Sequence, residues 1–166
     1  IYPSGGEYWV RPEAWDGLEP IADDSFAGDL SPLSSVAGPA RRAAHLGALL
    51  GTEPDIERWS EAFGALADHD ASDFESAIDE LIGVGVLVEA KGGGVRFRHG
   101  LLHEAVRRGA AESSEASAYH RLLADVLADD DVGRAGLHRK RAGLEGALGL
   151  LIDGGRRAIE EGQLRE

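Results

Sequence analysis

Apolar side chains recur at helical spacing in three successive segments of the first half of the chain. One helix is predicted over residues 38–50, because Pro39 suits a first helical turn and Gly51 provides a stop. A second is predicted over about 55–63, and a third over 72–83, where Ser-Asp-Phe-Glu fits a capping box. The third helix has an unbroken apolar face formed by Phe74, Ala77, Ile78, Leu81 and Ile82.

The spacing changes from helical to strand-like after Gly83 and Gly85. Residues 86–88 form a β-branched run, and residues 95–98 alternate apolar and basic side chains on the other side of a Lys-Gly-Gly-Gly turn. The pair predicts a β-hairpin. Three helices followed by a hairpin is the order of a winged helix-turn-helix, with the hairpin as its wing. We therefore predict a mainly α fold with a winged-helix domain over residues 37–111.

Helical spacing continues to the end of the sequence. Helices are predicted over about 101–110 and 114–128, and leucines indicate more of them after Gly133. Residues 112–166 are thus predicted to form helical hairpins of tetratricopeptide-like type, although no full repeat is present. Three aspartates at 129–131 predict a frayed end or a loop. The pair Gly154-Gly155 either breaks the last helix or weakens it.

Residues 1–36 have a different composition, rich in proline, glycine and aspartate. They predict a short hairpin followed by an irregular connector, which would belong to a preceding domain. Because the sequence starts at Ile1 and contains no methionine, we interpret it as a fragment or a processed chain.

Composition excludes several functions. The chain has no cysteine, so disulfides, thiol catalysis and cysteine-ligated zinc are excluded. Neither an apolar membrane span nor a charged-then-apolar leader is found, so we predict a cytoplasmic protein without membrane partners. Neither a nucleophile motif nor a carboxylate pair with recognisable spacing is present, and we do not predict an enzyme.

Charge is distributed unevenly. The formal net charge is -13, yet residues 91–111 contain five basic residues against Glu104 alone. Overall acidity argues against non-specific binding of nucleic acid, whereas a small basic region can hold one anionic ligand.

Two segments carry a resemblance to a known class of proteins. The sequences F-E-S-A-I-D-E-L-I-G-V-G-V-L-V-E and V-R-F-R-H-G-L-L-H-E-A-V resemble the winged-helix region of STAND-type signalling ATPases. That class includes maltose-regulator-like activators and the immune receptors of the NB-ARC and NACHT types. The resemblance covers about residues 34–166. A glycine-rich phosphate loop ending in Gly-Lys-Ser/Thr is absent, so the ATPase core would lie outside this chain.

The resemblance also implies a role for the basic stretch. His99 matches the histidine that touches the β-phosphate of ADP in the resting state of the immune receptors. An imidazole at the start of a helix, flanked by Arg96 and Arg98, is physically suited to a diphosphate. The expected cofactor is ADP or ATP in the parent protein, with none in this fragment. The expected partners are the nucleotide-binding domain of the same parent chain and a protein bound by the helical region.

Simpler interpretations remain for these residues. His99 could cap the helix and pack on the core, and the two arginines could simply face water. His99 and His103 are four residues apart and could suggest zinc, but a third ligand is missing and Glu104 does not follow the first histidine.

Two other functional classes stay open. A winged helix often binds DNA with its third helix, but that helix carries four carboxylates and no basic residue. DNA binding would have to use the wing, through Lys91, Arg96 and Arg98. The third possibility is a helical protein-interaction module with no link to a nucleotide.

Overall fold

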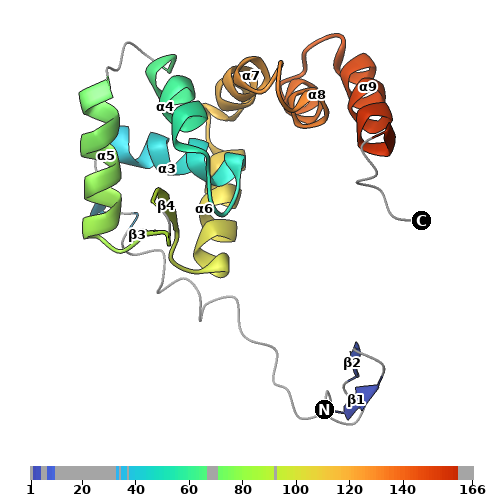
Figure 1. Cartoon of the computed structure of the whole chain (residues 1–166). Coiled ribbons are helices and arrows are strands. Elements are labelled where there is room, and N and C mark those ends of the chain that lie inside the picture. Colours follow the sequence, from blue (N-terminus) through green and yellow to red (C-terminus); the bar gives the residue numbers. More distant parts are fainter. Residues whose placement is uncertain are drawn as a thin grey trace.

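The computed structural model describes residues 2–4, 7–9, 33, 35–36, 38–66, 71–91 and 93–160 of the 166-residue chain. This part is mainly helical, with seven helices and two small antiparallel hairpins (Figure 1). None of the helices in it is both long and apolar enough to cross a membrane.

The first three helices occupy the predicted segments. They are α3 (Gly38–Leu50), α4 (Ile56–Gly64) and α5 (Ala71–Gly83). Asp55 caps α4, because its carboxylate accepts a hydrogen bond from the Arg58 amide at 3.0 Å. The start of α5 differs by one residue from the one that the capping box predicts. The helix already includes Ala71, so Ser72 lies in its first turn instead of at its N-cap.

Aromatic rings join these helices at the centre of the core. Trp59 is fully buried and donates its indole N–H to the Ala43 carbonyl at 2.8 Å. The ring lies directly on Gly47, where an added Cβ would come within 2.7 Å of the Trp59 Cε2 atom. Phe74 meets the indole edge-on at 5.5 Å between ring centroids. The predicted apolar face of α5 is therefore packed on α3 and α4.

The predicted wing is present. Strands β3 (Leu87–Glu89) and β4 (Val95–Phe97) pair antiparallel, with Leu87 opposite Phe97. Gly85 has a φ of 78°, in the left-handed region that a glycine adopts freely, and it turns the chain from α5 into β3. The arrangement of three helices and a hairpin is consistent with a winged helix.

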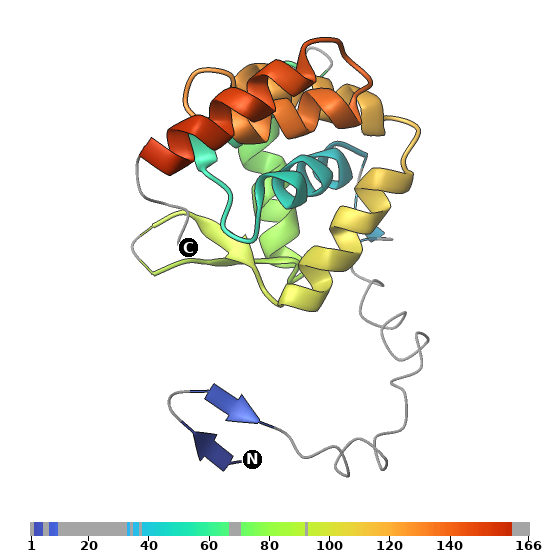
Figure 2. The same ribbon diagram turned by 90° about the vertical axis from the view of Figure 1, so that its right-hand side faces the viewer.

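Four helices follow the wing: α6 (Gly100–Glu112), α7 (Ala116–Val126), α8 (Val132–Arg141) and α9 (Ala147–Glu160). Figure 1 shows α7, α8 and α9 in a row that leads away from α4 and α5, and Figure 2 looks along this row with α9 in front. A turn does follow α7, as the aspartates predicted, but Asp131 has a second role. Its carboxylate accepts from the Arg134 amide at 3.0 Å and caps α8.

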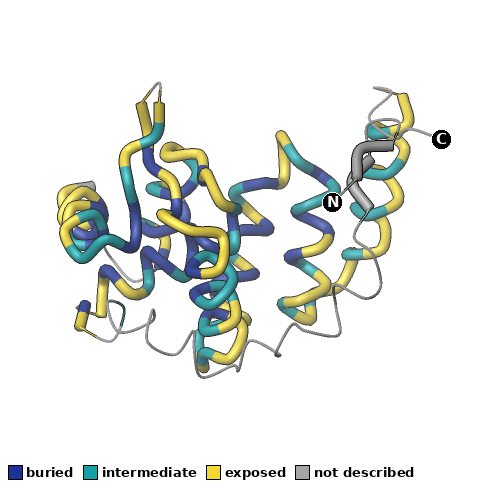
Figure 3. The backbone as a smooth tube through the Cα atoms, turned by 90° about the horizontal axis from the view of Figure 1, so that it is seen from below, coloured by how far each residue is buried: buried dark blue, intermediate teal, exposed yellow. Residues whose placement is uncertain are grey.

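The glycine pair does not break the last helix, because α9 runs through Gly154 and Gly155. Gly154 lies against Gly133 of α8, so the two backbones touch there. Figure 3 shows buried stretches in the helices around the wing and none in α9.

One hydrophobic core extends across the predicted boundary at residue 111. Tyr119 and Leu123 of α7, and Leu127 at its C-cap, belong to the same buried cluster as the aromatic residues of α4, α5 and β4. The boundary between a winged-helix domain and a helical region stays a prediction.

The hairpin predicted for the start of the chain is also present. It consists of β1 (Tyr2–Ser4) and β2 (Glu7–Trp9), with Tyr2 opposite Trp9. Most of the connector predicted within residues 1–36 lies outside the described residues.

Candidate functional site

The three residues predicted to bind a nucleotide lie together where β4 leads into α6. Arg96 faces outward from β4, while its neighbours Val95 and Phe97 are buried. The Arg98 amide donates to the Val86 carbonyl at 3.1 Å, which fixes the backbone just before α6. Its guanidinium lies over Gly85, where an added Cβ would be 2.6 Å from Nη1.

His99 occupies the N-cap position of α6, with extended backbone angles of -140° and 142°. Its side chain makes no capping hydrogen bond and is exposed. The interpretation that this imidazole caps the helix and packs on the core is therefore wrong. The imidazole and the first amides of α6 are left open to a ligand from outside.

The next residues on α6 already have partners within the protein. His103 places Nε2 2.9 Å from the Ala48 carbonyl, and its ring meets Phe97 edge-on at 5.1 Å. Glu104 accepts two hydrogen bonds from Arg107, at 2.9 and 2.6 Å. Hydrogen bonding from Arg107 lowers the pKa of the Glu104 carboxyl.

These contacts bear on the possible zinc site. His103 is bonded to Ala48 of α3, and Glu104 is paired with Arg107 of the same helix. Within the described residues, no group of three or more histidine, cysteine or acidic side chains is placed to hold a metal ion.

The outer face of α5 is acidic, as the sequence indicates. Asp73, Glu75 and Asp79 are exposed, and Glu80 is half-buried. A DNA backbone approaching this helix would meet carboxylates, which repel phosphates.

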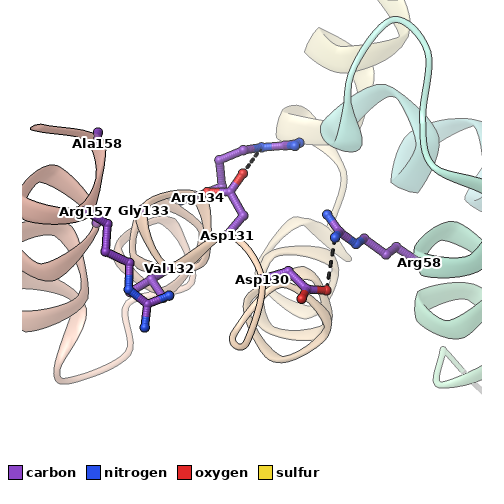
Figure 4. Close-up of a pocket in the computed structure, with 9 residues that line it drawn as sticks. Arg58, Asp130, Asp131, Val132, Gly133, Arg134, Arg157 and Ala158 are labelled. Atoms are coloured by element: carbon purple, nitrogen blue, oxygen red, sulfur yellow. Dashed lines mark hydrogen bonds and ion pairs between the residues drawn. The ribbon is translucent and has the colours of Figure 1, made fainter. Parts of the chain in front are cut away.

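A cleft that the sequence did not indicate lies between α4, the turn before α8, and α9. It has a volume of about 440 Å³, and Figure 4 shows three arginines around it. Arg58 pairs with Asp130 at 3.0 Å, and Arg134 lies 3.8 Å from Asp131. Arg157 extends from α9 without a partner among the described residues. The residues come from segments 100 positions apart, and no local pattern connects them.

No known family matches this chain, and neither a curated protein nor a solved structure matches it.

Proposed function

We propose that this chain is the regulatory arm of a nucleotide-dependent signalling switch. In this proposal the surface formed by Arg96, Arg98 and His99 closes over the diphosphate of ADP held by a nucleotide-binding domain of the parent protein. The observation that carries the proposal is the exposed His99 imidazole at the start of α6, with its capping position unused.

The groups at the start of α6, where β4 leads into the helix, suit a diphosphate. The first amides of a helix have no intrahelical acceptor, and the helix dipole places partial positive charge there. An imidazole N–H and two guanidinium groups add donors that pair with phosphate oxygens. The nucleotide would lie between this surface and the nucleotide-binding domain, because one exposed face supplies only part of the contacts that a bound nucleotide needs.

The contacts behind His99 provide a route by which nucleotide exchange could change the rest of the arm. His103, one turn further along α6, is bonded to Ala48 of α3 at 2.9 Å. The Phe97 amide donates to the Thr52 carbonyl, just after α3, at 3.0 Å. A ligand that pulls on His99 therefore acts on α3 through two hydrogen bonds. Exchange of ADP for ATP would shift the population between a closed and an open arrangement.

The exposed face of α9 favours a second role for the helical part. Leu148, Ile152 and Ile159 are 71, 52 and 67% exposed, and they follow one another at helical spacing. Apolar side chains gathered on one helix face are typical of a protein contact. This supports a protein partner for the helical region, with or without a nucleotide link.

The test is the change His99→Ala in the parent protein with its nucleotide-binding domain. Loss of a hydrogen bond to a charged phosphate costs about 1.5–3 kcal/mol, so ADP should dissociate roughly tenfold faster or more. The rate is measured by displacing a fluorescent ADP analogue in a stopped-flow instrument. Basal signalling should rise in parallel.

Arg121→Ala is the matched control, because Arg121 is also exposed and basic but lies on α7. It should leave ADP release unchanged. Equal release rates for the His99 variant and the unmodified protein would refute the nucleotide contact. Salt-sensitive binding of a DNA duplex, lost on changing Arg96, would instead support the wing as a DNA contact.

A further inference from the structure

A second cleft lies between α3, α6, α7 and α8. Its volume is about 380 Å³. The lining residues are Leu49, Arg107, Ala111, Ala116, His120 and Arg141. Two guanidinium groups and an imidazole thus line it without a carboxylate, although the chain as a whole has a net charge of -13.

His120 is the unusual member of this lining. The residue is only 6% exposed, and its Nδ1 lies 2.8 Å from Nδ1 of His138, which is 2% exposed. One of these two nitrogens must carry the proton of the bond, and the other must accept it. The contact fixes the orientation of the His120 ring.

The opposite nitrogen of His120 is free. Its Nε2 has no hydrogen-bond partner among the described residues. In that part of the chain, the only fully enclosed side-chain nitrogen or oxygen without a partner is Nδ1 of His45. The Nε2 atom of His120 is therefore not fully enclosed, and His120 is one of the residues that line the cleft.

An anion is the ligand that fits this nitrogen. When His138 donates to His120, the neutral His120 ring carries its proton on Nε2 and presents a donor to the cleft. When His120 is protonated, it donates to His138 through Nδ1 and again presents Nε2–H. A neutral His120 that donates through Nδ1 has an acceptor at Nε2 instead, so a bound anion would select one of the other two states. Burial, and then Arg141, lower the pKa of His120, so a bound negative charge would offset the second of these effects.

The two arginines differ in their availability. Arg107 is held by Glu104 in two hydrogen bonds, whereas Arg141 is exposed and has no partner in the described structure. Leu49 and the two alanines supply an apolar wall. A ligand with a charged group and a short apolar part would contact both kinds of surface.

We propose that this cleft binds a small organic anion, a carboxylate or a phosphate monoester, through the Nε2–H of His120 and the guanidinium of Arg141. The cleft beside α9 is the weaker candidate for an anion, because two of its arginines already lie beside Asp130 and Asp131. The proposed site involves helices on both sides of residue 111, so its ligand would hold α7 and α8 against α3 and α6. It does not depend on the nucleotide contact of His99.

The test uses this chain with two probes, butyrate and inorganic phosphate, each titrated against chloride at constant ionic strength. Imidazole nitrogen NMR shifts of His120 report binding at Nε2 directly. We expect a saturable shift with at least one probe. Saturation with butyrate alone assigns a carboxylate ligand, and saturation with phosphate alone assigns a phosphate ester.

Two neighbouring charge-neutralising variants decide whether the cleft is responsible. Arg141→Gln should weaken binding about three- to tenfold, since one charged donor is lost. Lys140→Gln removes the same charge from an exposed position that does not line the cleft, and it should leave the affinity unchanged. Absence of saturation with both probes, or equal loss in both variants, would overturn the proposal. His99→Ala should not alter this binding, which keeps the result separate from the nucleotide contact.

Discussion

The contact between Gly133 of α8 and Gly154 of α9 leads to a sharp prediction. A Cβ added at Gly154 would lie 2.6 Å from the Gly133 nitrogen, and closer still to its Cα. The obstacle is backbone, which cannot rotate away as a side chain can. Gly155, the next residue of the same helix, has nothing within 4 Å of an added Cβ. The variants Gly154→Ala and Gly155→Ala therefore differ only in the space that the new methyl group finds.

The magnitudes follow from two opposing effects. Alanine is favoured over glycine in a helix interior by about 1 kcal/mol, and both variants gain this. Overpacking typically lowers the free energy of unfolding by about 1–3 kcal/mol, and only Gly154→Ala introduces it. We expect Gly155→Ala to be as stable as the unmodified chain or more so. Gly154→Ala should be less stable than Gly155→Ala by about 1–3 kcal/mol.

Two measurements check this difference. Urea unfolding followed by circular dichroism gives the free energy of unfolding of each variant. Amide hydrogen exchange shows whether protection is lost first in α8 and α9, because the methyl group would separate these two helices. If Gly154→Ala were as stable as Gly155→Ala, with equal protection in α9, the close backbone contact would be refuted.

Two further predictions concern the core and the buried histidines. Gly47→Ala should lower the free energy of unfolding by about 2 kcal/mol, because its methyl group would overlap the buried Trp59 ring; an unchanged urea midpoint would contradict this packing. Burial lowers the pKa of His120 and lowers that of His138 to about 3. As pH falls below about 6.5, the unfolded chain binds protons that the native chain excludes, so stability should fall by about 1 kcal/mol per pH unit for His138. Urea midpoints between pH 7 and 5 measure this slope, and His138→Gln should flatten it.

The elements of the fold could be predicted because their signals are local. The apolar residues of α5 recur three and four positions apart, and this spacing alone defines a helix with one buried face. Gly83 and Gly85 mark its end, and the alternation of Val95, Arg96 and Phe97 marks a half-buried strand. The exposure of His99, in contrast to these elements, could not be predicted from the sequence. It depends on whether the imidazole turns back onto its own helix, which spacing does not determine.

The glycines of the last helices show where sequence reasoning stops. Gly154 in isolation indicates weakness or a break, because the intrinsic cost of glycine in a helix is all that a single segment reveals. Its actual role depends on Gly133, which lies 21 positions away in the sequence and touches it where α8 packs against α9. The same holds for Asp131, which follows α7 unfavourably but caps α8. Both clefts are also products of tertiary packing, since each gathers residues from several elements.

The contact of α7 with α3 connects the helices before residue 111 to the helices after it. Glu115 accepts from Arg42 at 3.1 Å and from the Tyr119 hydroxyl at 2.9 Å, and the Tyr119 ring is buried beside His45. Because α3 also receives the hydrogen bond of His103, it contacts both the helix that begins after His99 and the helix that leads towards α9. The Nδ1 atom of His45 is enclosed at this junction without a partner, which carries a desolvation cost. A small shift of α7 along α3 that gave this nitrogen a hydrogen-bond partner would recover that cost.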